Sequence, residues 1–431
     1  MGTFAAPVPQ QCLPMKQLLV IGYVWPEPDS TAAGVHMLSL LELFQSQYWE
    51  ITFASPATRS EQMADLESRG VHCVDIELND SSFDAFAEQL QPQVVLFDRF
   101  MMEEQFGWRI EKSCPEALRV LDTEDLFCLR HARHDEFKKN GQINPALTPA
   151  LLFTELALRE IASILRCDLS LIISEVELGL LTEIFNVDPA LLHYYPLCLA
   201  PEALSRPTPS FEAREGFITI GNFRHPPNWD AVRWLRESIW PQVRSLLPRA
   251  QCRIYGAYTP PKASALHNPE QGFHIMGWAR DAQAVLQSAR INLAPLRFGA
   301  GLKGKLVEAM ACGTPSVTTS IGAEGLAGDL PFAGAVSDQP EAIARQAVAL
   351  SQDPGLWQAA QHNGLTIVRQ RFDRQGHNRG LVDKIQYLRQ RLGQHRLHNF
   401  AGTMLRHHFH NSTRYMSQWI EAKNQLSRER D

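Results

Sequence analysis

The sequence contains no closely spaced cysteine pair, although it has eight cysteines. They stand singly, at positions 12, 73, 114, 128, 167, 198, 252 and 312. Zinc sites and small disulfide scaffolds need paired or clustered cysteines, so this spacing argues against both and favours a reducing compartment. The sequence also lacks an excess of positive charge: its formal net charge of −6 gives no reason to expect nucleic acid as a partner.

No apolar run approaches the length of a membrane-spanning helix. The first fifteen residues lack the basic region and hydrophobic stretch of a secretory signal, and they match a myristoylation pattern poorly. We therefore expect a cytoplasmic protein, with attachment to the inner face of the cytoplasmic membrane left open. The loop after Ile21 lacks the GxGxxG of a dinucleotide-binding fold, which disfavours a dehydrogenase.

What the sequence does contain is a regular alternation of short apolar runs with helical patterns. The runs expected to form strands are 17–21, 51–54, 71–76, 94–97, 118–121, 169–173, 217–220, 252–255, 291–294 and 316–318. This alternation is typical of parallel sheets covered by helices on both faces. A stretch rich in proline, serine and charge near residues 200–215 separates two such halves. We predict a leader over 1–15, α/β domains over 16–205 and 206–371, and a helical segment with a polar tail over 372–431.

The strongest functional signal is the segment FGAGLKGKLVEAMACGTPSVTT, which begins at Phe298. Its three glycines surround Lys303 and Lys305 directly before a helical pattern. A glycine loop that enters a helix exposes backbone N–H groups where the helix dipole is positive. The lysines add full positive charges, and Glu308, one turn into the helix, offers a carboxylate to hydroxyl groups. These features predict a site for a nucleoside diphosphate, whereas an isolated Lys305–Glu308 surface ion pair is the alternative.

A second cluster of chemistry-bearing residues follows the apolar run 118–121. It consists of Asp122, Glu124 and Asp125, which would face the gap between the two domains if the fold is as predicted. Two interpretations stay open, a direct role at a reacting centre and an acidic turn that caps a helix.

Two runs resemble the sugar-nucleotide domain of the retaining family 4 glycosyltransferases: GNFRHPPNWDAVRWL from Gly221, and GWARDAQAVLQSARINLAPLRFGAGLKGKLVEAMACGTPSVTTSIGAEGL from Gly277. The match covers most of residues 216–326, and LLVIGYVWPEPDSTAAGV and RVLDTEDLFCLR extend it less tightly into the first half. The resemblance implies an α/β protein of GT-B fold, with two Rossmann-like doubly wound domains facing a central cleft and C-terminal helices.

It further implies transfer of a sugar from a nucleotide-diphosphate-sugar to a glycan, lipid-linked or protein acceptor, with retention of configuration. No cofactor and no metal are expected, because GT-B enzymes generally need none and DTED is not the DxD pattern of the metal-dependent class.

Family members usually carry two glutamates separated by seven residues. Glu308 occupies the second position, which contacts the nucleotide ribose, whereas Ala300 stands where the first contacts the donor sugar. Arg224 fits one member of a basic pair that grips the pyrophosphate. Asn228 stands near the other member, and we expect it to cap the following helix instead. We hypothesise that one of the loop lysines supplies the missing charge.

In the first half, Glu124 stands near the position of a family histidine that contacts the donor sugar or the reacting centre. Gly34 is expected in a loop that approaches the donor closely, and Trp278 near the base, with an ordinary buried tryptophan as the alternative. The candidate catalytic residues are Glu124, Asp125, Lys305 and Glu308. The candidate donor-binding residues are Gly34, Gly221, Arg224, Trp278, Gly299, Ala300, Gly301, Leu302, Lys303, Lys305 and Glu308.

Two other functions stay open. The replacements at Ala300 and Glu124 also fit a non-catalytic sugar-nucleotide-binding or scaffold protein, and epimerases and phosphorylases share the fold. The histidines of the C-terminal segment lack the i,i+4 spacing and the cysteine or carboxylate partners of a metal site. We expect a solvated or membrane-surface helix there, with Trp419 and Ile420 as contacts. The sequence gives no oligomeric state.

Overall fold

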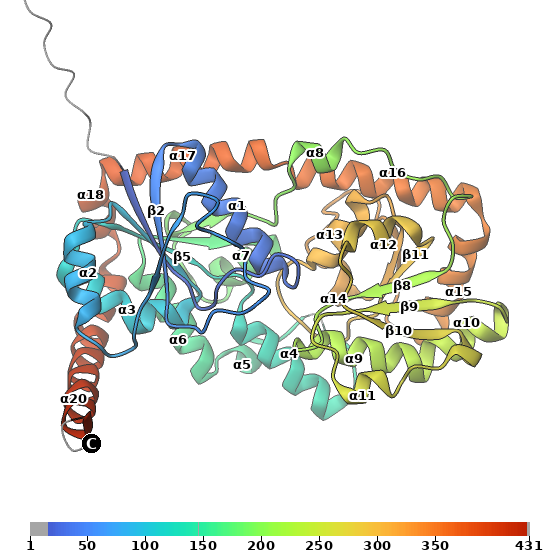
Figure 1. Cartoon of the computed structure of the whole chain (residues 1–431), viewed down its shortest axis with the longest axis horizontal. Helices are drawn as coiled ribbons and strands as arrows, with labels where there is room; N and C mark the ends of the chain where they lie inside the picture. The colour runs from blue at the N-terminus through green and yellow to red at the C-terminus, as the bar shows by residue number, and fades with distance from the viewer. Residues whose placement is uncertain (1–15, 145, 429–431) are drawn as a thin grey trace, which may run out of the picture.

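The computed structural model describes residues 16–144 and 146–428, and it contains two parallel sheets in two halves of the molecule (Figure 1). The first sheet has the order β3-β2-β1-β4-β5-β6-β7 and the second the order β10-β9-β8-β11-β12-β13. The strands of the first are β1 (Lys16–Ile21), β2 (Trp49–Ser55), β3 (His72–Asp75), β4 (Val94–Asp98), β5 (Leu118–Asp122), β6 (Leu169–Ile172) and β7 (Leu192–Tyr194). Those of the second are β8 (Phe217–Ile220), β9 (Cys252–Tyr255), β10 (Phe273–Gly277), β11 (Ile291–Ala294), β12 (Ser316–Thr318) and β13 (Gly334–Val336). The two doubly wound sheets expected from the sequence are therefore confirmed, and the predicted leader lies outside the described residues.

Helices cover both faces of the sheets, which is why the central strands are apolar throughout. Every residue of β4, β5 and β11 is buried, whereas the edge strand β3 is partly exposed. The helices of the first half are α1 (Ala32–Ser46), α2 (Ser82–Leu90), α3 (Phe100–Ser113), α4 (Phe127–Asn140), α5 (Pro149–Leu152), α6 (Glu155–Arg166) and α7 (Glu175–Glu183). Those that follow, up to the last strand, are α8 (Pro201–Leu204), α9 (Pro226–Trp234), α10 (Trp240–Leu246), α11 (Pro261–Ser264), α12 (Ala282–Ser288), α13 (Gly304–Ala311) and α14 (Ser320–Ala323). Short 3₁₀ or π turns occupy Pro189–Leu191, Leu235–Ile239, Pro269–Gln271 and Arg406–His410.

In both sheets the strand order reverses once, between β1 and β4 and between β8 and β11. Ligands of such sheets bind at the carboxyl ends of the strands, at this point of reversal. Loops from these ends meet across the two halves: Tyr258 donates a hydrogen bond to Glu27 Oε2 (2.9 Å), and Trp278 Nε1 donates to the Asp29 carbonyl (3.2 Å). The two carboxyl edges therefore face each other.

The last helices are α15 (Pro340–Gln352), α16 (Pro354–Arg371), α17 (Arg374–Gln390), α18 (Leu392–His398), α19 (Phe400–Leu405) and α20 (Asn411–Arg428). Figure 1 shows α16 over the second half and α17 over the first. Arg374 pairs with Glu42 of α1 (2.7 Å), and Leu381 and Leu388 enter the core of the first domain. The chain after α17 continues along that domain, and no helix within the described residues is long and apolar enough to cross a bilayer.

Candidate functional site

The glycine-rich loop between β11 and α13 faces the first domain. Gly301 has a φ of 64°, and a Cβ atom at this position would lie 2.7 Å from Asp125 Cβ. The Gly301 N–H donates a hydrogen bond to Glu177 Oε1 of α7 (2.8 Å). A glycine is needed here for both conformation and space, so the loop is fitted closely to the opposite domain.

The N-terminus of α13 points at the N-terminus of α1 across the same boundary. A Cβ atom on Gly304 would lie only 2.7 Å from Ala32 Cβ, and Lys303, the residue before the helix, is buried. The N–H groups at the start of a helix are unpaired within the helix and favour anions. In this arrangement of the domains the first turns of the two helices are in contact at Gly304 and Ala32.

The two lysines of the loop have different partners. Lys303 Nζ donates to the carbonyls of Ala300 (3.1 Å) and Gly301 (2.6 Å), so it closes its own loop. Lys305 Nζ donates to Asn228 Oδ1 of α9 (2.6 Å). Burial lowers the pKa of Lys303, and burial together with the charge of Lys303 lowers that of Lys305 to about 8. Among the described residues both ammonium groups donate hydrogen bonds to neutral oxygens alone, so an anionic ligand would provide a directly paired charge.

Asn228 corrects a prediction, because it does not cap the helix. α9 begins at Pro226 with His225 as its N-cap residue. The Asn228 side chain instead donates to the Asn222 carbonyl (2.9 Å) and accepts from Lys305. Gly221 makes this contact possible, since a Cβ atom there would lie 2.7 Å from Lys305 Nζ.

Glu308 lies one turn after Lys305 and is half-buried. Burial raises the pKa of its carboxyl to about 7, against the opposing charge of Lys305. Within the part of the chain that the structure describes, this carboxylate has no hydrogen bond. Its oxygens have no hydrogen-bond partner among the described residues, and the predicted hydrogen bonds from hydroxyl groups of a ligand stay a prediction.

Two further candidates lie at loops that follow β8 and β10. The exposed Arg224 side chain stacks on Tyr258, with its guanidinium carbon 3.5 Å from the ring centre. Trp278 is 49% exposed, so the alternative of an ordinary buried tryptophan is wrong. Its indole nitrogen contacts the loop that precedes α1.

Three other candidate donor-binding residues, Gly34, Ala300 and Leu302, present no side chain to the space between the domains. Gly34 lies in the first turn of α1, where its N–H donates to the Thr31 hydroxyl (3.0 Å), and not in the preceding loop. The side chains of Ala300 and Leu302 are buried in apolar clusters. A contact of Ala300 or Leu302 with a donor would therefore have to use the backbone.

The acidic turn after β5 belongs to a buried cluster of charge. Glu124 has a φ of 54° and a buried Oε1 atom with no hydrogen-bond partner among the described residues. His36 Nε2 of α1 lies 3.6 Å from Asp122 Oδ1. Burial acts to lower the pKa of His36, but Asp122 outweighs it and raises the value to about 9. Burial and Asp122 together raise the pKa of Glu124 to about 8, so near neutral pH its carboxyl is largely protonated.

Asp125 lies at the domain boundary beside Gly301 and is paired with Arg130 (2.9 Å). Arg130 Nη1 in turn lies 3.5 Å from His225 Nε2 of the second domain. Burial lowers the pKa of His225 to about 4, so this histidine is neutral. The structure therefore brings the acidic turn and the glycine loop together, as the sequence predicts.

Two residues that join the domains, Glu177 and Arg133, could not be recognised from the sequence. Glu177 Oε1 accepts from both Leu126 N (3.0 Å) and Gly301 N. Arg133 of α4 donates to the Gly299 carbonyl (2.9 Å) and forms an ion pair with Glu324 (2.6 Å). Glu177 and Arg133 are 124 and 166 residues from the loop positions they contact, so no local pattern marks them.

Comparisons with known proteins indicate which class of protein this chain resembles. Residues 214–353 match the family model described as Glycosyl transferases group 1. Similar solved structures include sucrose-phosphate synthase from Thermosynechococcus elongatus, with a TM-score of 0.61, 14% identity, and coverage of 86% of this chain and 99% of that one. The HepE protein of Anabaena in complex with UDP-glucose has a TM-score of 0.63 and 12% identity, with coverage of 86% and 100%. WaaG, described as a glycosyltransferase involved in lipopolysaccharide biosynthesis, has a TM-score of 0.60 and 11% identity, with coverage of 85% and 99%.

The fold is therefore GT-B, and residues 214–353 in its second half are similar to group 1 glycosyltransferase domains. No curated protein sequence matches the chain.

Proposed function

We propose that this protein is a retaining glycosyltransferase of the family 4 type, which transfers a sugar from a nucleotide-diphosphate-sugar to an acceptor. The observation that carries the proposal is the N-terminus of α13. Two lysines that bond neutral oxygens and a carboxyl group without a hydrogen bond among the described residues stand there, opposite the acidic turn of the other domain. The group 1 family match of this segment supports the same reading.

Each residue has a defined task in this proposal. The N–H groups at the start of α13, with Lys303, Lys305 and Arg224, stabilise the charge that the leaving diphosphate gains. Glu308 accepts hydrogen bonds from the ribose, and Trp278 lies against the base. Because these side chains supply the positive charge, we expect activity in the presence of EDTA.

Binding of the donor requires the two domains to move apart, because Gly304 and Ala32 are in contact in this structure. The contacts between the domains combine hydrogen bonds, such as those of Glu177, Arg133 and Tyr258, with apolar packing. Phe137 of the first domain stacks on Phe298 of the second, and Ile173 shares an apolar cluster with Leu306, so an opening motion breaks both kinds of contact. Closure over the bound donor would then exclude water and limit hydrolysis.

The acceptor would enter from the side of the first domain. Glu124, protonated near neutral pH, is suited to donate a hydrogen bond to a hydroxyl of the donor sugar or the acceptor. No covalent nucleophile is assigned, so we propose a same-face route in which the leaving phosphate assists deprotonation of the acceptor. The described cysteines are all unpaired, in keeping with action in the cytoplasm.

The similar structures indicate where to begin the search for substrates. HepE is described in complex with UDP-glucose, and TarM of S. aureus in complex with UDP and fondaparinux. We therefore propose UDP-sugars as the first donors to test and glycans as the first acceptors. The test is a thermal-shift screen against UDP-, GDP-, dTDP- and ADP-sugars, because ligand binding stabilises the folded state. It is followed by product analysis with glycan, lipid-linked and protein acceptors.

A second function, a non-catalytic sugar-nucleotide-binding protein, is favoured by one observation. Ala300 stands where the family has an acid, and it is buried in the core of the first domain. This function predicts donor binding without turnover for any acceptor. Absence of binding to all four donors would refute both functions.

A further inference from the structure

The chain beyond α17 forms an ordered helical layer on the outside of the first domain. α18, α19 and α20 follow one another there, and α20 lies along α3 at the end of the molecule remote from the second domain (Figure 1). One stripe of this layer is buried against the domain, through Gly402, Arg406, His410 and Ser417. The spacing of these residues follows the helical period, so the layer has a fixed inner face.

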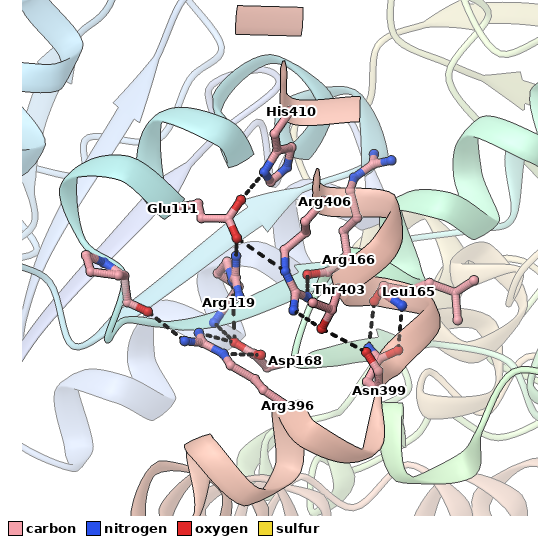
Figure 2. A network of polar contacts seen from close by, with 12 residues as sticks. Glu111, Arg119, Leu165, Arg166, Asp168, Arg396, Asn399, Thr403, Arg406 and His410 are labelled. Atoms are coloured by element: carbon pink, nitrogen blue, oxygen red, sulfur yellow. Dashed lines mark hydrogen bonds and ion pairs between the residues drawn. The ribbon is translucent and has the colours of Figure 1, made fainter. Parts of the chain in front are cut away.

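Charged groups hold the inner face in place (Figure 2). Arg396 forms a two-pronged ion pair with Asp168, with both N–O distances 2.8 Å. Arg406 donates to the Arg166 carbonyl (3.1 Å) and lies 3.4 Å from Glu111. Because buried paired charges tolerate little displacement, the helices cannot rotate freely about their axes.

The opposite face of the same layer is apolar and uncovered. Phe400, Met404, Tyr415, Trp419 and Leu426 recur at intervals of four, eleven, four and seven residues, the spacing of a single helical stripe. Between 47% and 75% of each of these residues is exposed. A regular stripe of this kind is unusual on a free surface and marks a contact site.

The stripe is accompanied by positive charge. Residues 391–431 contain seven Lys or Arg and three Asp or Glu, in a chain whose formal charge is −6. Glu421, the single acid among the described residues of this segment, faces the protein body, where it accepts hydrogen bonds from Ser81. Arg414 and Lys423 are exposed, and the Lys423 ammonium lies 5.4 Å from the Trp419 ring centre. The outer face therefore combines aromatic side chains with two cations that form no ion pair with a described residue.

We infer that this outer face binds the surface of an anionic lipid bilayer. An amphipathic helix with aromatic residues on one side and Lys or Arg beside them lies in the plane of the membrane interface. Tyrosine and tryptophan suit that boundary because each has an apolar ring and a polar group. A second copy of this chain is a poorer occupant, because pairing the same face with itself would bring like charges together.

The experiment is co-sedimentation of the full chain with vesicles. Phosphatidylcholine vesicles containing phosphatidylglycerol are compared with vesicles of phosphatidylcholine alone. The expected result is binding to the anionic vesicles only, weakened by added salt. Arg414→Gln with Lys423→Gln should lower the partition coefficient about 30-fold, at about 1 kcal/mol per charge. Tyr415→Ser with Trp419→Ser should lower it roughly tenfold or more.

Matched controls come from the second domain. Leu246→Ser with Leu356→Ser removes two equally exposed apolar side chains, and Arg249→Gln with Arg345→Gln removes two exposed cations. Both control pairs should bind the anionic vesicles as the wild type does. All substituted residues are exposed, so unchanged unfolding midpoints will verify that each variant is folded.

Three results would overturn the inference. They are absence of binding to anionic vesicles, equal binding to neutral vesicles, and wild-type binding by the stripe variants. A dimer that the Tyr415→Ser, Trp419→Ser variant abolishes, without vesicle binding by the wild type, would assign the face to a second copy instead. None of these outcomes depends on the sugar-transfer reaction.

Discussion

Replacement of Lys305 by methionine provides the sharpest test of the proposed donor site. Methionine keeps the unbranched apolar stem of the side chain and removes only the ammonium group. In the proposal that group neutralises the diphosphate, and in the folded protein its one hydrogen bond goes to the neutral Asn228 amide. Donor binding and folding stability should therefore respond differently to this single change.

The magnitude follows from the charges involved. A hydrogen bond to a charged group contributes about 1.5–3 kcal/mol, so donor affinity should fall roughly 10- to 150-fold. In the folded protein, burial lowers the pKa of Lys305 from 10.5 to about 8. Burial therefore destabilises the charged form of the Lys305 side chain by about 3 kcal/mol relative to its neutral form. Methionine removes this cost and loses one hydrogen bond of about 1.5–3 kcal/mol, so we expect the free energy of unfolding to stay the same or rise by up to about 1.5 kcal/mol.

Isothermal titration calorimetry with the donor found in the thermal-shift screen measures donor affinity. Urea unfolding measures the free energy of unfolding. Lys139→Met, an exposed residue of α4, is the matched control and should change neither. Because only the charged lysine binds the diphosphate, wild-type affinity should fall as pH rises through about 8, and Lys305→Arg should remove this dependence. Unchanged donor affinity together with a large loss of stability would show that Lys305 is structural, and the reasoning would fail.

Three further predictions test the surroundings of the site. Glu177→Ala leaves two N–H groups of the domain boundary unpaired and should lower the free energy of unfolding by about 3 kcal/mol, whereas Glu177→Gln should cost less than about 1 kcal/mol in urea unfolding. The pKa of Glu124 is about 8 when folded and 4.5 ordinarily, so the folded state binds more protons between these values. Wild-type stability should therefore fall relative to Glu124→Gln as pH rises from about 4.5 to 8, which thermal unfolding across that range will measure. Arg396→Ala removes one partner of the buried Asp168 and should cost about 3 kcal/mol in urea unfolding, while Arg391→Ala, at an exposed site in the same layer, should cost less than about 0.5 kcal/mol.

Much of the fold could be predicted from the sequence, because its central strands are apolar on both faces. Runs such as LLVI in β1 and VVLF in β4, which alternate with helices, predict buried parallel strands. The three strands that were not predicted, β7, β10 and β13, are edge strands, and β7 and β13 have three residues each. There one face or one edge is open to solvent, so the apolar pattern is interrupted and the signal weakens.

The site could be predicted only where its parts are adjacent in sequence. The glycine loop, its lysines and Glu308 fall within ten residues. A loop followed by a helix therefore suffices to place them together. The role of Asn228 could not be predicted, because a capping asparagine and one that holds a lysine 77 residues away look the same in a sequence. The same holds for His36, whose partner Asp122 lies on another element.

The structure places a carboxylate from the other domain near Ala300, the loop position where the family pattern has an acid. An acid is missing from that position of the loop, yet the carboxylate of Glu177 contacts the loop at the next residue, from the opposite domain. Its second oxygen is buried and has no hydrogen-bond partner among the described residues, and burial with the nearby charge of Asp125 raises its pKa to about 8. A carboxyl group is thus present beside the loop in this arrangement, and in the proposed opening motion it would leave the loop. Because that acid comes from the other domain, any contact it makes with a bound donor would form only on closure, which couples donor recognition to the exclusion of water.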